Sequence, residues 1–143
     1  MAFSLRVRCV AIAALLQALT GCAADAVVDL NVEAWDARAL ASAEVVVCSA
    51  RDRSRVLEDV TLTPTSSSTV TLPADGSAVA FAATSPDGMC AATCQVELEP
   101  DAQIATTLIL HPCLTCPTLD ATAANVCLDP LCFMSEAELS GCE

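Results

Sequence analysis

The chain of 143 residues contains no lysine and no tyrosine, and it has a single histidine and a single tryptophan. It has six arginines and 18 acidic residues, which gives a formal charge of −12. A surface of this sign repels phosphate backbones, so the sequence argues against nucleic acid as a partner. Because aromatic residues make up only 3% of the chain, the core must be built mainly from Val, Leu, Ile and Ala, which suits β-sheet faces.

The sequence also lacks the common catalytic signatures. It contains no Gly-x-Ser-x-Gly elbow, no glycine-rich phosphate loop and no His-Glu-x-x-His motif. His111 lies between Leu110 and Pro112, where we expect a strand to end at the surface. Glu97 and Glu99 are spaced to share one strand face, and paired carboxylates can act as acid and base, but alternation puts this pair on the solvent side. We therefore predict no enzyme activity, no catalytic residue and no cofactor.

The first 21 residues have the pattern of a secretory signal helix. Arg6 and Arg8 form a short basic start, and a mainly apolar run follows from Cys9 to Leu19. This run is too short to cross a bilayer, which takes about 20 apolar residues.

The end of this leader, Leu19-Thr20-Gly21-Cys22, resembles the lipobox of bacterial lipoproteins. The resemblance implies cleavage before Cys22, a diacylglyceryl group on its thiol, an acylated amino group and a short lipidated linker over residues 22–26. Ala23, in place of the aspartate that retains such proteins in the inner membrane, implies the outer membrane of a Gram-negative envelope. An ordinary leader that happens to hold a cysteine at this point is the alternative.

Cysteine usage fits an exported protein. Of the ten cysteines, Cys9 leaves with the leader and Cys22 receives lipid, so an even number remains. We predict that these form four disulfides, with a pairing that sequence alone leaves open: Cys48, Cys90, Cys94, Cys113, Cys116, Cys127, Cys132 and Cys142. Three of these cysteines lie in the body, residues 27–112, and five lie in the tail, residues 113–143. Because both numbers are odd, at least one bridge must join the body to the tail. We expect Cys113 at the tail end of such a bridge.

Two other interpretations of these cysteines are open. Cys113-x-x-Cys116 resembles half a zinc knuckle, although Cys127 and Cys132 have the wrong spacing for the second half. The same pair also resembles a redox motif, but prolines bracket it and no thioredoxin-like unit follows.

Residues 27–112 alternate between apolar and polar side chains, the period of a half-buried strand. Val28, Leu30 and Val32, for example, share one face of a first strand. Turn sequences Pro73–Gly76 and Ser85–Gly88 separate later segments. We predict an all-β fold, a seven-stranded antiparallel β-sandwich, with strands near residues 28–34, 44–50, 56–62, 70–72, 79–83, 96–98 and 104–110. The run from Asp36 to Val47 is similar to transthyretin-like and carboxypeptidase-regulatory-like domains, although it lacks their glycine-rich loops, and an immunoglobulin-like sandwich is equally open.

Residues 113–143 form a disulfide-rich tail without alternation, which we expect to be largely irregular. Asp120–Val126 is compatible with a short helix capped by Asp120, and Ser135-x-x-Glu138 matches a capping box. Trp35 has the parity of the polar residues in the first strand, and we expect it at the edge of the core. If exposed, it would be the best candidate for partner binding.

These features predict a non-catalytic lipoprotein of the cell envelope that presents a disulfide-stapled sandwich for structural use or for binding an envelope protein. Its membrane contact would be the lipid anchor. The alternative is a small-ligand or metal-binding protein that uses the cysteine-rich tail.

Changing Cys22→Ser is expected to abolish lipid labelling and membrane fractionation while the fold is retained, because Cys22 completes the lipobox and belongs to no disulfide. Metabolic labelling with a fatty acid and detergent partitioning measure this. Unchanged detergent partitioning of the variant would contradict lipidation at Cys22.

Overall fold

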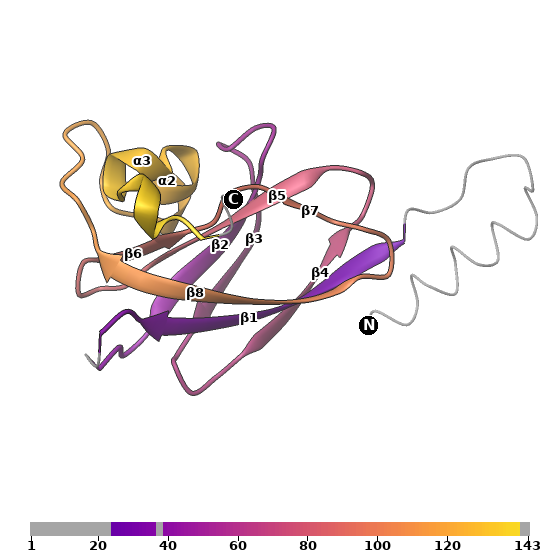
Figure 1. Ribbon diagram of the computed structural model, residues 1–143, viewed down its shortest axis with the longest axis horizontal. Coiled ribbons are helices and arrows are strands. Elements are labelled where there is room, and N and C mark those ends of the chain that lie inside the picture. The colour runs from indigo at the N-terminus through magenta and orange to yellow at the C-terminus, as the bar shows by residue number, and fades with distance from the viewer. Residues whose placement is uncertain (1–23, 37–38, 141–143) are drawn as a thin grey trace, which may run out of the picture.

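The computed structural model describes residues 24–36 and 39–140 (Figure 1). The predicted leader, the lipidation site Cys22 and the cysteine at 142 lie outside these residues. The described chain is mostly β, with short helices only near its end. Its elements are β1 (Asp25–Ala34), β2 (Ala43–Ser49), β3 (Val56–Leu62), β4 (Ser68–Pro73), β5 (Ala78–Thr84), β6 (Met89–Ala92), β7 (Val96–Glu97), β8 (Gln103–Pro112), α2 (Ala123–Leu128), α3 (Pro130–Phe133) and the 3₁₀ helix η1 (Glu136–Glu138). None of these helices has the length and apolar character needed to cross a lipid bilayer.

The strands form one nearly closed mixed sheet. Their order is β3-β2-β5-β6-β8-β1-β4, and β7 pairs with β5 beside this path. β3 and β4, at the two ends of the order, are consecutive in the chain and diverge from their connecting loop (Figure 1). β1 and β8 run parallel, from Val27 opposite Gln103 to Ala34 opposite Leu110, and the other pairings between these strands are antiparallel.

The predicted all-β fold is confirmed, but the seven-stranded antiparallel sandwich is not: the sheet has eight strands, and one pair, β1 with β8, is parallel. The missed strand, Met89–Ala92, is buried along its whole length, so it carries no alternation that a period of two could reveal. The parallel pair was missed because side chains alternate in the same way whichever direction a neighbouring strand runs. A parallel pair needs a crossover connection, which here is the whole chain between β1 and β8.

The main core lies inside this sheet. The alternation predicted for the first strand is confirmed, because Val28, Leu30 and Val32 are buried while Asp29 and Glu33 are exposed. Both predicted turns are confirmed as well, since Gly76 and Gly88 have φ angles of +86° and +78°, a conformation that glycine adopts without strain.

A second apolar cluster lies on the outer face of β2, β5 and β6, under the helices of the tail. The strands contribute Val46, Cys48, Ala80, Ala82, Cys90 and Ala92, and the tail contributes Ala123, Val126, Cys127, Phe133 and Met134. β2 is thus buried on both faces, which explains its unbroken apolar run. The alanines of β5 and β6 keep this face flat, so the helices can pack close to the strands.

The tail is more ordered than the sequence predicted. It forms two short α-helices in place of irregular chain, because the second cluster supplies an apolar surface for them. The expected cap at Asp120 is wrong: α2 begins at Ala123, and Thr122 Oγ1 accepts a hydrogen bond from Asn125 N at 3.2 Å. The Asp120 carbonyl instead accepts from Asn125 Nδ2 at 2.9 Å.

We expect Phe133→Ala to lower the free energy of unfolding by about 3–5 kcal/mol, because this side chain is 1% exposed and its loss leaves a cavity under α3. Leu131 lies on the same helix but is 58% exposed, so Leu131→Ala should change stability by less than about 0.5 kcal/mol. Chemical denaturation with the bridges intact measures both. Equal effects of the two variants would show that the tail does not pack on the sheet as described.

Candidate functional site

Three disulfides have both cysteines in the described residues. They are Cys48–Cys127, Cys90–Cys113 and Cys116–Cys132, with Cα–Cα distances of 6.4, 5.0 and 5.2 Å. The first two bridges each join a strand to the tail, which confirms the crossing that cysteine parity required. Cys113 is confirmed as the tail end of one of them.

The two cysteines of the Cys113-x-x-Cys116 motif belong to different bridges. Cys113 is bonded to Cys90 and Cys116 to Cys132. A redox pair must be able to bond to itself, and a zinc knuckle needs both thiolates free for the metal, so this arrangement provides neither site. Cys94 is disulfide-bonded too, and no cysteine of the described chain is free. Across residues 24–36 and 39–140, no group of three or more His, Cys, Asp or Glu side chains is placed to hold a metal ion.

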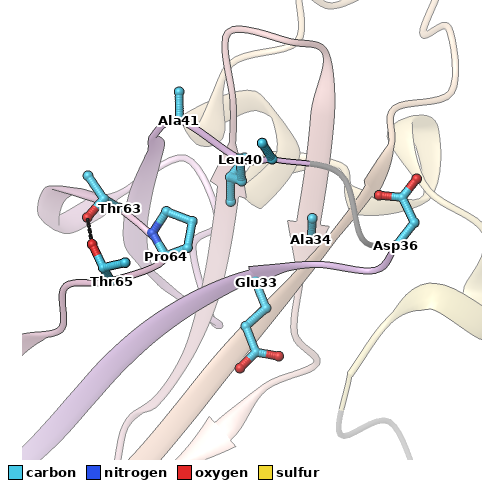
Figure 2. A pocket seen from close by; sticks show the side chains of 9 residues that line it. Glu33, Ala34, Asp36, Leu40, Ala41, Thr63, Pro64 and Thr65 are labelled. Atoms are coloured by element: carbon cyan, nitrogen blue, oxygen red, sulfur yellow. Dashed lines mark hydrogen bonds between the residues drawn. The ribbon is translucent and has the colours of Figure 1, made fainter.

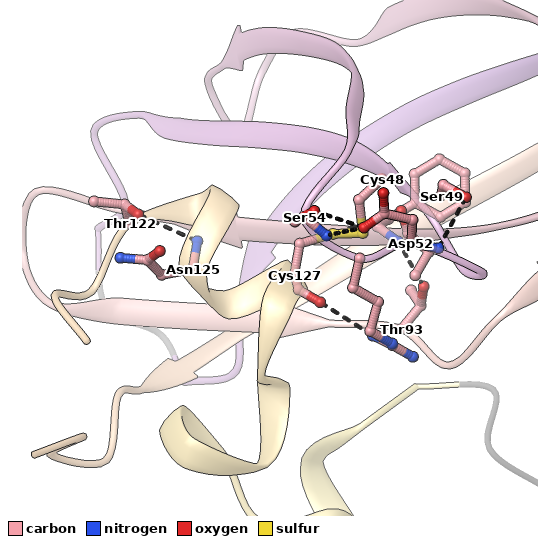
Figure 3. The surroundings of a disulfide bond; sticks show 11 residues. Cys48, Ser49, Asp52, Ser54, Thr93, Thr122, Asn125 and Cys127 are labelled. Carbon is pink, nitrogen blue, oxygen red and sulfur yellow. Dashed lines mark hydrogen bonds between the residues drawn. A yellow bond between two sulfur atoms is a disulfide. The ribbon is translucent and has the colours of Figure 1, made fainter. Parts of the chain in front are cut away.

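The Cys48–Cys127 bridge joins β2 to α2 and is almost fully buried (Figure 3). Arg53, from the turn between β2 and β3, donates from Nη1 to the Cys127 carbonyl at 3.2 Å. A cation is favourable there because the carbonyls of the last helical turn carry partial negative charge. The same turn is held by Asp52, whose Oδ1 accepts from Ser54 N at 3.2 Å. Hydrogen bonds from Ser54 lower the pKa of the Asp52 carboxyl, because they favour its charged form.

Trp35 lies on the surface, stacked against His111. Its side chain is 53% exposed, and the two rings are 5.7 Å apart at an interplanar angle of 17°. The expected position at the edge of the core is therefore wrong: Trp35 follows the polar parity of β1 and faces outward. A hydrogen bond from Trp35 N to the Leu110 carbonyl, 3.0 Å, continues the pairing with β8 and brings the indole beside His111. His111 itself is at the end of β8, as predicted.

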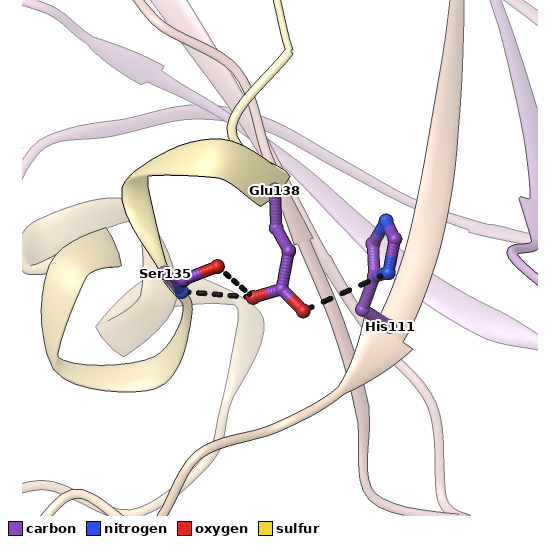
Figure 4. Close-up of polar contacts among 3 residues, drawn as sticks. All are labelled: His111, Ser135 and Glu138. Carbon is purple, nitrogen blue, oxygen red and sulfur yellow. Dashed lines mark hydrogen bonds and ion pairs between the residues drawn. The ribbon is translucent and has the colours of Figure 1, made fainter.

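Glu138 connects His111 to the end of the tail (Figure 4). Its Oε2 accepts hydrogen bonds from Ser135 N and Ser135 Oγ, both at 2.8 Å, which confirms the predicted capping box. Its Oε1 lies 3.7 Å from His111 Nδ1. Hydrogen bonds from Ser135 lower the pKa of the Glu138 carboxyl, and the nearby His111 lowers it further.

These three residues do not form a nucleophile site. In a Ser–His–Asp triad the histidine lies between the hydroxyl and the carboxylate and accepts the proton of the nucleophile. Here the carboxylate of Glu138 lies in the middle, and the Ser135 hydroxyl donates to it. The arrangement fastens η1 to the end of β8, and it lacks the contact between histidine and hydroxyl on which a triad depends.

Glu97 and Glu99 are both exposed, as expected from their parity. Glu97 is the last residue of β7, and Glu99 follows in the connection to β8. Within the described residues, neither glutamate forms an ion pair or a hydrogen bond with His111.

An open groove of about 620 Å³ lies between the end of β1 and the loop that joins β3 to β4 (Figure 2). It is lined by Glu33, Ala34, Asp36, Ala39, Leu40, Ala41, Thr63, Pro64 and Thr65. The hydroxyls of Thr63 and Thr65 lie 3.3 Å apart. No sequence pattern marks this groove, because its size depends on how the folded chain separates the end of β1 from the loop between β3 and β4. The lining contains no cysteine or histidine, and it shows no reactive cluster.

Comparison with known proteins assigns no family. No protein-family model and no curated protein matches the sequence. A solved structure described as "Crystal Structure of S.CueP" superposes with a TM-score of 0.42 and 11% identity, over 64% of this chain and 65% of that chain. The match thus spans less than two thirds of the other protein, and it is too distant to indicate a shared function.

Peptide mapping of the non-reduced protein should recover the three bridges described above and a fourth between Cys94 and Cys142. Cys142 lies outside the described residues, but it is the remaining member of the eight cysteines that we predict to form disulfides. The backbone already brings the end of the tail to Cys94, whose N donates to the Ser140 carbonyl at 3.0 Å. A free thiol at position 142, or a peptide linking Cys142 elsewhere, would contradict this pairing.

Proposed function

We propose that this chain is a lipoprotein of the Gram-negative outer membrane, anchored at Cys22, whose disulfide-fastened β domain binds an envelope protein through the surface around Trp35. The proposed function involves no catalysis. The lipobox supports the lipid anchor, which the Cys22→Ser experiment tests. The surroundings of Trp35 in the fold support the binding surface.

Trp35 is about half exposed and is stacked on its neighbour His111. Stacking on His111 orients the indole, so little side-chain freedom remains to be lost when a partner covers it. Tryptophan is also enriched among the residues that contribute most to binding energy in protein interfaces. Ile109, which is 40% exposed, extends the apolar surface, because it shares its strand face with His111 and lies opposite Glu33 on β1.

The position of Trp35 along β1 suits presentation away from a membrane. β1 starts at Asp25, three residues after the predicted lipid site, and it runs for ten residues. A strand of this length spans about 30 Å, and Trp35 follows its far end. The indole therefore lies near the end of β1 opposite Asp25, the residue of this strand that follows the predicted lipid site most closely in sequence.

The alternative function, a ligand or metal site in the cysteine-rich tail, has less support. Cys113, Cys116, Cys127 and Cys132 all lie in bridges, which removes the thiolates that a soft metal would need.

Photocrosslinking in the native envelope tests partner binding. We expect a crosslinker placed at Thr107, on the exposed face of β8, to capture a discrete partner, and we expect Trp35→Ala to reduce that product at least severalfold. A crosslinker at Glu58, exposed on β3, is the matched control and should give no such product. Because Trp35 is on the surface, the variant should keep its melting temperature. Equal products from both positions, or a product that persists in Trp35→Ala, would overturn the proposal.

A further inference from the structure

We infer that the surface around Trp35 binds a basic protein segment, with an arginine side chain of the partner packed against the indole. This inference rests on the proposed function and adds the chemistry of the partner. The surface, called here the Trp35 face, is the outer face of the parallel pair β1 and β8. It consists of Asp29, Asn31, Glu33 and Trp35 from β1 and Ala105, Thr107, Ile109 and His111 from β8.

The Trp35 face is the part of the outer surface that the tail leaves open. The apolar cluster under α2 and α3 is built on β2, β5 and β6, and none of its members belongs to the Trp35 face. Asn31 and His111 are partly buried, and the other six residues of the face are exposed. Two paired strands therefore present a continuous accessible strip, with its apolar side chains, Trp35 and Ile109, at one end.

The acidic side chains of this strip are Asp29 and Glu33, and it contains no arginine or lysine. Asp29 and Glu33 alternate along β1 with Asn31 and Trp35, and Glu138 adds a third carboxylate beside His111. A hydrogen bond from Thr69 Oγ1 to Asp29 Oδ1, 2.6 Å, holds the first carboxylate in place. Within the described chain, no arginine forms an ion pair with Asp29 or Glu33.

The described arginines are gathered elsewhere. Arg51, Arg53 and Arg55 all lie in or beside the turn between β2 and β3, and Arg53 is engaged with the Cys127 carbonyl. None of these three arginines therefore neutralises the carboxylates of the Trp35 face.

An arginine side chain of a partner can interact with both the exposed indole and the carboxylates of the strip. The face of an indole attracts cations, and a planar guanidinium can stack on the ring while its N–H groups donate to a carboxylate. Glu33 is two residues before Trp35 on the same strand face, which places its carboxylate within reach of a group stacked on the indole. His111 occupies one side of the ring, so the partner would approach the other. Acidic proteins and anionic lipid headgroups would be repelled by the same charges.

Fluorescence provides a direct test, because Trp35 is the only tryptophan in the chain. The full-length lipoprotein in neutral detergent is titrated with a synthetic peptide of arginine, glycine and serine. Peptides with lysine or glutamate in place of arginine serve as comparisons. We expect a saturable change in Trp35 emission with the arginine peptide, a weaker effect with lysine, none with glutamate, and loss of binding at high salt.

Charge-matched variants separate a site from general attraction. Glu33→Gln should weaken binding of the arginine peptide by about twofold to fivefold, the effect of losing one exposed ion pair. Glu58→Gln removes the same charge from β3, outside the Trp35 face, and should leave the affinity unchanged. Equal effects of the two variants, or equal binding of the glutamate peptide, would overturn the inference. If crosslinking at Thr107 still depends on Trp35 in that case, partner binding stands and only the cationic chemistry fails.

Discussion

The structure depends on the attachment of a tail that has little stability of its own. α2 has six residues and α3 has four, well below the length at which an isolated helix persists in water. The Cys48–Cys127 bridge closes a loop of 79 residues, which in the chain-entropy account is worth about 4.5 kcal/mol. It also holds α2 on β2, where Phe133 and Met134 can complete the apolar cluster. Without this attachment, the outer face of β2 would expose Val46 to water.

The placement of the tail divides the outer surface of the sheet into two parts. β2, β5 and β6 are covered, and their outward side chains are apolar and small. β1 and β8 are uncovered, and their outward side chains are mostly polar or acidic. The boundary runs past His111, where Glu138 of the tail contacts the end of β8 and Trp35 contacts the same imidazole. The most exposed aromatic side chain of the described residues thus lies where the covered and uncovered parts meet.

This division gives the proposed function a physical basis. A disulfide-fastened domain keeps its shape in an oxidising compartment, and β1 connects the region of the predicted anchor to Trp35 in one extended strand. The surplus of acidic residues, which argues against nucleic acid, is also the charge that the proposed basic partner would complement at a surface that carries an oriented indole.

The sequence by itself determined the features that depend on local chemistry. The alternation of Val28, Leu30 and Val32 specifies a strand with one buried face, and the positive φ angles of Gly76 and Gly88 follow from turn composition. The Ser135–Glu138 capping box spans four residues and needs no distant partner. Parity alone required a bridge from body to tail. Each of these properties depends on a few neighbouring residues, or, for the bridge, on the number of cysteines in the body and in the tail.

Only the tertiary structure decided the properties that depend on distant segments. The parallel pairing of β1 with β8 joins segments about 75 residues apart, and alternation does not encode direction. Met89–Ala92 became a strand because both of its faces are covered, and the choice among disulfide pairings depended on which strands the tail reached. Trp35 is exposed for the same reason. Its parity set the face it occupies, but only the placement of the tail on β2, β5 and β6 left that face open to solvent.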